Sequence, residues 1–598
     1  MSLNTTRRFL RAFLAYLNPL ILTSAIIHWV KSDKKIPDRE TFRNLPPQKK
    51  YYVGLVSLLL IGAVLAVGVQ FYLANTQTVP ARGGEYKEAL IGAPRFINPA
   101  LAPTNDVDRD ISSLVYASLL KYDENGELTP DLVESFEILE GGRQYRFNLK
   151  NNIVWEDGTA ITAEDVIFTI NLIQDAQYSS PLNANWQGVT ATSEGEHTVI
   201  FELSSSYAPF LENTTVGILP RHIWKDISPA SFTLTDFNLQ PVGSGPFVIE
   251  KFTKDSSGFI ISYTLKRNEK YHGQKPYLNR ITFKFFPSEE TALAALNANS
   301  VDGIAALSAS NVGKIKVAKT LNMHEFSMPR YFSIFFNAEK SEILEDKRVR
   351  EALTHATDKQ KIIDEILNGF ARVADTPIPP ALEKYYNANT DNPKFDLELA
   401  RKLLDDANWT DTDGNGTRDK VFRAADGPRP LEFDLVTVRW PELELVAAKI
   451  AEQWREVGVQ LNVKLQDLGE LQQSFIRPRN YDTLLFGEVL GTIPDPFSFW
   501  HSSQKNDPGL NLSRYDNRTA DRLLEQTRQE LDLTTQIEQH RRLQETIVND
   551  LPAIFLYEPT YLYPVHKGIQ GIEPSLLVDP SHRFDNVEKW FVETRRVF

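Results

Sequence analysis

Residues 145–170, which read YRFNLKNNIVWEDGTAITAEDVIFTI, place a strand, a turn and a helix start in direct succession. The first six residues alternate apolar and polar side chains, as a strand with one buried face does. The stretch NNIVWEDGT that follows has the composition of a turn. Thr162, with Asp165 three residues later, forms a variant of the capping box that begins many helices. This stretch therefore predicts a compact lobe in which strands and helices are mixed.

Strand and helix patterns continue on both sides of this stretch. Further strands are expected at 198–203, 247–252, 259–266 and 281–286, with a helix over 289–299. Beyond residue 340, helix patterns alternate with strands expected at 431–438, 459–468 and 483–490. This alternation predicts a second α/β lobe, whose sheet ends are available to form one wall of a cleft.

Length, charge and cysteine content narrow the function. At 598 residues the chain is longer than one hydrophobic core usually supports, so two or more lobes are expected. The formal net charge of -13 argues against nucleic acid as a partner. The sequence contains no cysteine, which excludes disulfides, thiolate metal sites and a lipid-modified cysteine. Any membrane anchor must therefore be a protein segment.

An uncharged run of 22 residues at 53–74 reads VGLVSLLLIGAVLAVGVQFYLA. As a helix it would be about 33 Å long, enough to cross the hydrocarbon core of a bilayer. The basic residues before it favour the cytoplasmic side of the membrane. We therefore expect a cytoplasmic segment at 1–52, one transmembrane helix at 53–74, a linker at 75–84 and an extracytoplasmic domain at 85–598. A cleaved signal peptide is the alternative reading of the run.

A second apolar stretch, at 13–30, is interrupted by Asn18, Pro19 and His28. Such interruptions are costly within a membrane span. We expect an amphipathic segment at the membrane surface, with a second span as the alternative. In either case the large domain is expected outside the cell membrane.

Several segments occur in the order found in one family of transport proteins. The first is INPALAPTNDVDRDISSLVYASLLKYDENGELTPDLVESFEI at 97–138, and WEDGTAITAEDV at 155–166 is the most specific. PVGSGPFVIEKF, FFNAEKSEILEDKRVREALTHATDKQKII and LPAIFLYEP follow in the same order. Over nearly all of residues 85–598, the chain resembles the family 5 solute-binding proteins, which are the oligopeptide- and dipeptide-binding components of ABC importers.

The resemblance implies a hinged protein of two lobes and three domains, the type 2 periplasmic-binding-protein fold. The first lobe would combine residues 85–122, 238–340 and 565–598, with an inserted domain at 123–237, and the second lobe would span 341–564. The lobes would close over a peptide or similar small solute and deliver it to ABC permease subunits in the membrane. No cofactor is required for this function.

The resemblance also implies where the ligand binds. In peptide-binding relatives, the strand before a D/E-P pair offers backbone groups to the ligand, and an acidic residue binds its α-amine. Here the strand residues are Gly487, Glu488 and Val489, and the pair begins at Asp495. Thr492 occupies the position of the usual aspartate. Because threonine carries no charge to bind an α-amine, this difference weakens the prediction of a peptide ligand. Glu488 and Asp495 are the candidates to supply the charge instead, and a surface carboxylate in a turn is the plainer interpretation of each.

Two further pairs of residues are candidate ligand contacts. Arg439 and Trp440 follow the strand at 431–438, where a guanidinium can bind a carboxylate and an indole can cover an apolar side chain. The alternative is an ion pair at the strand end and a core tryptophan. Asn105 and Asp106 lie in a loop that lines the cleft in relatives, or they are turn residues.

The segment 411–419 (DTDGNGTRD) has the alternating oxygen ligands of a calcium loop. These candidate ligands are Asp411, Asp413, Asn415, Thr417 and Asp419, with Gly416 where a sharp turn is needed. The twelfth position holds Phe422 instead of a bidentate glutamate. A structural calcium ion and a metal-free turn are therefore both open.

The sequence lacks the common catalytic motifs. Gly243-Ser244-Gly245 lacks the spacing of a nucleophile elbow, and His324-Glu325 is followed by no second histidine at zinc spacing. No P-loop or dinucleotide fingerprint occurs, so we expect a binding protein and not an enzyme. The competing hypothesis is a membrane-tethered sensor or scaffold that uses the same binding fold.

Overall fold

The computed structural model describes residues 43–44, 46–422, 427–573 and 576–598. The chain divides into two compact units. One consists of Met1–Ala81 with Glu593–Phe598, and the other is Arg82–Val592.

The described part of the smaller unit contains helix α4 (Pro47–Asn75) and a two-stranded antiparallel sheet. Strand β1 (Gln77–Pro80) pairs with β23 (Thr594–Val597) near the end of the chain. The Arg596 guanidinium donates to the hydroxyl of Thr76, the residue that follows α4, at 3.2 Å. The predicted linker at 75–84 thus contains a strand, because pairing with a distant segment leaves no mark in local composition.

Helix α4 covers the run at 53–74. Among the residues that the structure describes, no helix is both long enough and apolar enough to cross a membrane. An uncharged run is necessary for a span but does not establish one. The prediction of a transmembrane helix at 53–74, and with it that of a single-pass protein anchored in the bilayer, is therefore not supported. The stretch 13–30 and most of the segment 1–52 lie outside the described residues.

In the larger unit, a seven-stranded sheet brings together strands from both ends of the chain. Its strands, in spatial order, are β13 (Leu321–Phe326), β22 (Tyr561–His566), β12 (Gly303–Ile304), β2 (Glu85–Ile91), β11 (Arg280–Phe286), β10 (Ile260–Arg267) and β9 (Phe247–Lys254). Strand β2 is parallel to both of its neighbours, β11 and β12. Helices α5 (Asp106–Val115) and α10 (Glu289–Asn297) belong to this part of the unit.

A separate four-stranded antiparallel sheet is inserted between β2 and β9. It consists of β5 (Val133–Leu139), β6 (Gln144–Leu149), β8 (Thr198–Leu203) and β7 (Val189–Ser193), with helix α6 (Ala163–Gln174). A small pair, β3 (Leu120–Tyr122) and β4 (Leu128–Pro130), precedes it, and the short helices α7 (Phe210–Asn213), α8 (Arg221–Trp224) and α9 (Pro229–Phe232) follow. Thr162 and Asp165 form the reciprocal capping box at the start of α6. The strand, turn and helix predicted over 145–170 are confirmed.

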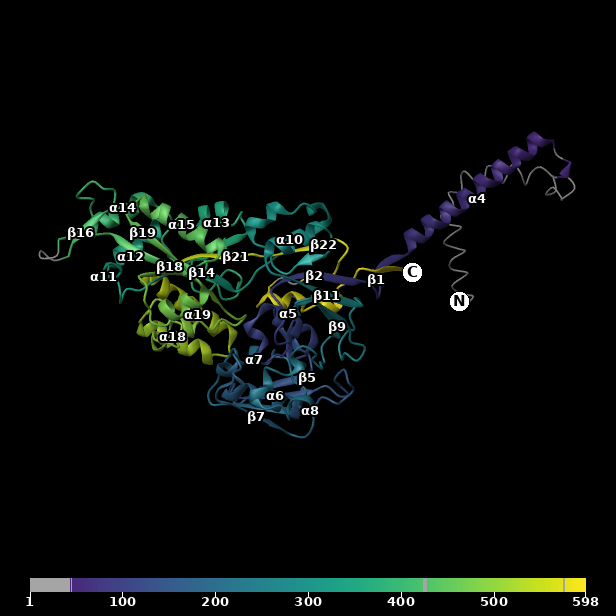
Figure 1. The fold of residues 1–598 in the computed structure, drawn as a ribbon, viewed down its shortest axis with the longest axis horizontal. Helices are drawn as coiled ribbons and strands as arrows, with labels where there is room; N and C mark the ends of the chain where they lie inside the picture. The colour runs from purple at the N-terminus through teal and green to yellow at the C-terminus, as the bar shows by residue number, and fades with distance from the viewer. Residues whose placement is uncertain (1–42, 45, 423–426, 574–575) are drawn as a thin grey trace. The chain divides into compact units, whose positions relative to one another are not determined.

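The third sheet has six strands. In spatial order they are β15 (Ala371–Val373), β21 (Ala553–Pro559), β14 (Arg330–Phe336), β20 (Thr483–Val489), β18 (Glu432–Val438) and β19 (Gln460–Gln466). Strand β18 is parallel to both neighbours, as α/β alternation predicts. Figure 1 shows helices α13 (Lys359–Ile366), α14 (Leu397–Asp406) and α15 (Pro441–Arg455) on one side of this sheet, and α18 (Arg518–Gln529) and α19 (Leu533–Asp550) on the other. The remaining elements are α11 (Glu342–Glu345), α12 (Lys347–His355), α16 (Leu468–Glu470), α17 (Phe497–Trp500), β16 (Asp419–Val421) and β17 (Pro428–Pro430).

The chain passes between the seven-stranded and six-stranded sheets at 327–329 and returns at Thr560. We call residues 82–326 and 561–592 the first lobe and residues 330–559 the second lobe. The first crossing ends 11 residues before the boundary expected at 340, and the second lies five residues before the one expected at 565. The expected bounds came from the family resemblance, whereas the sheet to which a strand belongs is decided by long-range strand pairing.

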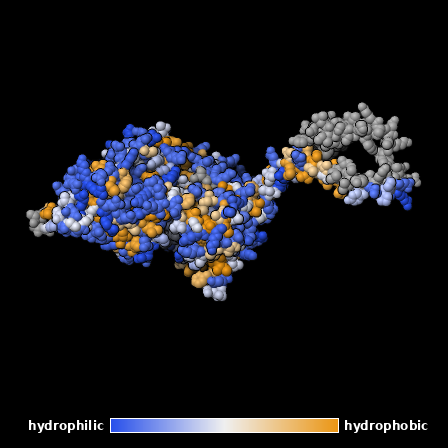
Figure 2. Space-filling model, turned by 90° about the horizontal axis from the view of Figure 1, so that it is seen from above, coloured by the Kyte–Doolittle hydropathy of each residue, from blue (hydrophilic) through white to orange (hydrophobic). Residues whose placement is uncertain are grey.

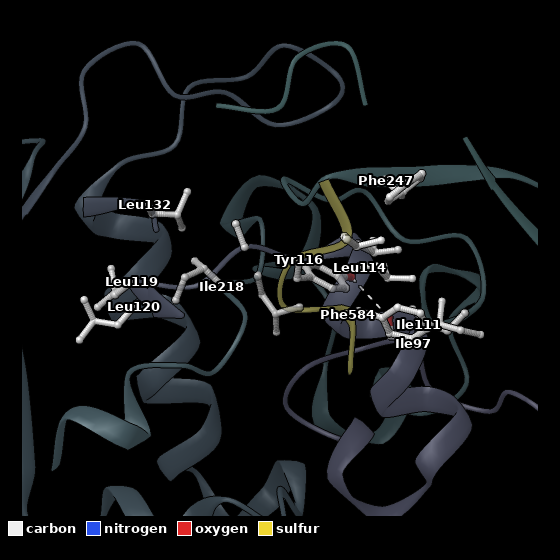
Figure 3. Packing of buried hydrophobic residues seen from close by; sticks show 14 of the residues in the cluster. Ile97, Ile111, Leu114, Tyr116, Leu119, Leu120, Leu132, Ile218, Phe247 and Phe584 are labelled. Carbon is white, nitrogen blue, oxygen red and sulfur yellow. Dashed lines mark hydrogen bonds between the residues drawn. The ribbon is translucent and has the colours of Figure 1, made fainter. Parts of the chain in front are cut away.

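Each lobe has its own hydrophobic core. One cluster joins the seven-stranded and four-stranded sheets, and a second fills the space around the six-stranded sheet. Figure 3 shows part of the first cluster, in which the Tyr116 hydroxyl donates to the backbone carbonyl of Ile97 at 3.4 Å. The face of the larger unit seen in Figure 2 is mostly hydrophilic, with hydrophobic side chains in scattered groups.

A buried ion cluster ties the C-terminal segment into the first lobe. The Arg583 guanidinium is fully buried and lies 3.0 Å from Glu88 on β2 and 2.6 Å from Asp110 on α5. These three charges come from opposite ends of the chain. Because each charge is removed from water, the loss of any one of the three would leave the others buried without full compensation.

Candidate ligand-binding site

A cavity of about 400 Å³ lies inside the first lobe. Its walls come from α5, β3, the segment 578–588 and the short helix α7 beside the four-stranded sheet. Tyr116 and Phe584 (Figure 3) contribute to both the hydrophobic cluster and the cavity wall. The volume is within the range of pockets that hold small ligands.

Two cationic side chains line this cavity, and both already have anionic partners. Arg109 lies 3.8 Å from Asp579 and also contacts Asp106. The Lys121 ammonium lies 3.1 Å from Glu588. The positive charges of Arg109 and Lys121 are thus balanced by neighbouring carboxylates.

Two carboxyl groups of the wall have no cationic partner among the described residues. Among the described residues Asp585 forms no ion pair within 4.0 Å and no side-chain hydrogen bond. Burial raises its pKa well above the ordinary range, although Lys121 acts on it from farther away. Glu212, on α7, accepts only neutral donors, and burial raises its pKa as well. Both groups therefore lie where a charge is costly unless a cation approaches.

Glu212 also joins the two lobes. The Thr492 hydroxyl donates to Glu212 Oε1 at 2.6 Å, and the backbone N–H of Ile493 donates to the same oxygen at 2.8 Å. A Cβ atom at Gly491 would lie 2.0 Å from Glu212 Oε2, so a larger residue there would force the Glu212 carboxylate to move. The loop 491–493 thus forms a cradle for a carboxylate.

A second contact between the lobes involves Asp495. Its carboxylate accepts a hydrogen bond from the Tyr207 hydroxyl at 3.0 Å and lies 3.1 Å from the Arg528 guanidinium. The Arg528 guanidinium also lies over the Tyr207 ring, at 5.0 Å from its centroid. Thr492 and Asp495, both predicted from sequence, are thus brought to the boundary between the lobes, and Asp495 is already paired.

The predicted strand residues occupy the end of β20. Glu488 is 2% exposed and accepts a hydrogen bond from Tyr331 in the core. Burial raises the pKa of Glu488 to about 8. Its side chain is therefore part of the core of the second lobe, while that of Val489 is exposed and Gly487 lies against the Phe332 ring.

The remaining predicted contacts lie apart from the cavity wall. Arg439 is exposed and lies 3.6 Å from Asp467, as the strand-end ion pair predicts. Trp440 is not a core residue, since it is 46% exposed. Asn105 caps α5 by accepting from the backbone N–H of Val107 at 2.9 Å.

The loop at 411–419 has the compact shape expected of a calcium loop or an Asx turn. Carboxylate oxygens of Asp411, Asp413 and Asp419 lie within 4.8 Å of one another. Asp411 accepts hydrogen bonds from the backbone N–H groups of Gly414, Asn415 and Gly416. The backbone N–H of Thr417 donates to the Asn415 side chain at 2.7 Å, so this side chain serves the turn.

Sequence reasoning did not identify Glu212, Asp585 or Tyr207 as site residues. Glu212 contacts Thr492 across 280 residues of chain, and Tyr207 contacts Asp495 across 288. The sequence around these residues carries no motif. The one available signal was Gly491, which stands directly before Thr492 and admits a close neighbour.

Comparison with known proteins shows which family has a similar sequence and fold. A family model described as bacterial extracellular solute-binding proteins, family 5 middle, matches residues 127–510. The oligopeptide-binding protein AppA of Bacillus subtilis is 30% identical over 523 residues, covering 86% of this chain and 92% of the relative.

Solved structures agree with the sequence comparison. The structure of Bacillus subtilis AppA in complex with a nonapeptide has a TM-score of 0.69 at 28% identity, covering 86% of this chain and 100% of that one. The structure of NikZ from Campylobacter jejuni in complex with Ni(L-His) has a TM-score of 0.69 at 25% identity, covering 85% and 99%.

Proposed function

Since this chain belongs to family 5 of the bacterial extracellular solute-binding proteins, we propose that the solute it binds is a peptide, which it delivers to the permease of an ABC importer. The observation that supports a peptide is the similarity, over 86% of the chain, to an oligopeptide-binding protein. The protein acts by binding alone and performs no covalent chemistry.

The two connections between the lobes, at 327–329 and at Thr560, act as the hinge. The first lobe includes the domain inserted around the four-stranded sheet, and the second lobe closes against it. Ligand shifts the population toward the closed form because it contacts both lobes only there. The hydrogen bonds from Thr492 and Ile493 to Glu212 join the two lobes directly and add to the contacts that favour the closed form.

The end of β20 supplies backbone groups to an extended peptide. Strand β18 pairs with β20 only as far as Leu485, which leaves the edge at 486–489 unpaired with β18. Extended ligands bind such strand edges through main-chain hydrogen bonds. Trp440, half-exposed at the end of β18, covers an apolar side chain of the ligand, and Arg439 is placed near it for a carboxylate.

The full chain should retain peptides when it is incubated with a mixture of random peptides two to nine residues long and then separated from unbound material. Mass spectrometry of the material released on unfolding identifies the ligand. Retention of peptides supports the proposal. Retention of a nickel complex or a sugar in place of peptides would overturn it.

We also propose that the loop 411–419 binds calcium as a structural ion, through Asp411, Asp413 and Asp419. Hard carboxylate oxygens this close together suit calcium, and cation binding offsets their mutual repulsion. Excess calcium should raise the melting temperature relative to EDTA, and Asp413→Asn should reduce that increase. Equal melting temperatures in calcium and EDTA would contradict a calcium site and leave the metal-free turn.

A further inference from the structure

We propose that the cavity of the first lobe binds a primary ammonium group of the ligand through the carboxylates of Glu212 and Asp585, which both line it. This inference rests on the proposed function, because it names the part of a peptide that enters the cavity. It assigns ligand recognition to the first lobe, at residues outside the predicted strand and loop.

The distribution of charge in the wall supports a cationic ligand. Arg109 and Lys121 are both paired, with Asp579 and Glu588 respectively. Asp131, another wall residue, lies 2.9 Å from the His272 ring nitrogen. After these pairs are formed, the carboxyl groups of Glu212 and Asp585 remain without a cation within ion-pair distance among the described residues, and Lys121 reaches Asp585 only from farther away. A buried carboxylate is stable when a cation with hydrogen-bond donors lies beside it.

The position of Glu212 links the cavity to closure of the lobes. One carboxylate oxygen, Oε1, is held by Thr492 and Ile493 of the second lobe. The residue is at the same time part of the cavity wall. An ammonium group bound in the cavity would therefore contact a carboxylate that the second lobe orients, so that binding and closure favour each other.

The protein offers little to an anionic group in the same place. A ligand carboxylate in the cavity would lie beside Asp579, Asp585 and Glu588, and the two cations of the wall would have to leave their present partners. Like charges in a site shielded from water repel strongly. The chemistry of the wall therefore selects for a cation.

An ammonium group of a peptide comes either from its N-terminus or from a lysine side chain. Three peptide mixtures separate these sources. The first has free N-termini and no lysine, the second is N-acetylated and has no lysine, and the third is N-acetylated and contains lysine. Each is presented to the full wild-type chain, and the retained peptides are quantified by mass spectrometry.

We expect the acetylated, lysine-free mixture to be retained at least tenfold less than one or both of the mixtures that carry an ammonium group, because charged hydrogen bonds are lost. The mixture that is retained identifies the source. Equal retention of all three mixtures would overturn the inference while leaving peptide binding intact. Retention of none would overturn peptide binding, and the inference with it.

Variants test the two carboxyl groups individually. Glu212→Gln keeps an oxygen that can accept from Thr492 and Ile493, so it removes charge with little change in the contact between the lobes. Asp585→Asn likewise keeps the size of the side chain. Each variant should bind the most strongly retained ammonium-bearing peptide at least tenfold more weakly than wild type.

The matched control is Glu202→Gln, which removes a carboxylate from an exposed position on β8 in the same lobe. It should bind as wild type does. Wild-type affinity in both Glu212→Gln and Asp585→Asn would overturn the inference. Melting temperatures measured for all three variants separate a loss of binding from a loss of folding.

Discussion

Arg583→Met should lower the free energy of unfolding by about 3 to 5 kcal/mol, because it leaves two carboxylates buried without their cation. The guanidinium is fully buried and lies 3.0 Å from Glu88 and 2.6 Å from Asp110. Methionine replaces the aliphatic part of the side chain and none of its hydrogen bonds. Urea unfolding followed by tryptophan fluorescence measures the change.

The control for this variant is Arg146→Met, which breaks an exposed pair with Glu194 on the four-stranded sheet. Exposed pairs contribute little to stability, so the unfolding midpoint should stay close to that of wild type. Similar midpoints for Arg583→Met and Arg146→Met would contradict a stabilising role for the buried cluster.

In the wild-type protein, Glu488 should make the free energy of unfolding fall as pH rises. Glu488→Gln should remove this pH dependence. Burial raises the pKa of Glu488 to about 8, while the ordinary value is 4.5. Between these values the folded state keeps a proton that the unfolded state has lost, so the free energy of unfolding falls by about 1.4 kcal/mol per pH unit. Glutamine has no proton to lose. From pH 5 to pH 8, the variant should therefore gain about 4 kcal/mol relative to wild type.

Urea unfolding at pH 5, 6, 7 and 8 tests this dependence. Glu444→Gln, at an exposed position on α15, is the control and should follow the pH dependence of wild type. A constant difference between Glu488→Gln and wild type across this pH range would show that Glu488 is ionised in the folded protein at all four values.

Much of the local structure was predictable because it depends on neighbouring residues. Alternation at 145–150 and the pair Thr162 and Asp165 were sufficient to place β6 and the start of α6. The α/β character of the second lobe followed from the alternation of its strands with amphipathic helices. In contrast, the strand β1 in the predicted linker depends on β23, more than five hundred residues away, and no local pattern indicates it.

The site was less predictable for the same physical reason. Thr492 and Asp495 were identified from the chain segment that carries them, but their partners Glu212 and Tyr207 lie on another lobe. Glu488 was predicted as a ligand contact because the family resemblance places it on the strand that offers groups to the ligand. Its burial depends on Tyr331 from the neighbouring strand β14, which the sequence around Glu488 does not reveal.

The order of strands in the two lobes also bears on synthesis of the chain. The second lobe, residues 330–559, is one continuous segment and can fold as soon as it has left the ribosome. The first lobe begins earlier but needs β22, and Glu88 and Asp110 have no cation until Arg583 has been made. The part of the protein that is translated first is therefore the part that is completed last, and a ribosome that stops between residues 559 and 583 releases a chain with a complete second lobe and an incomplete first one.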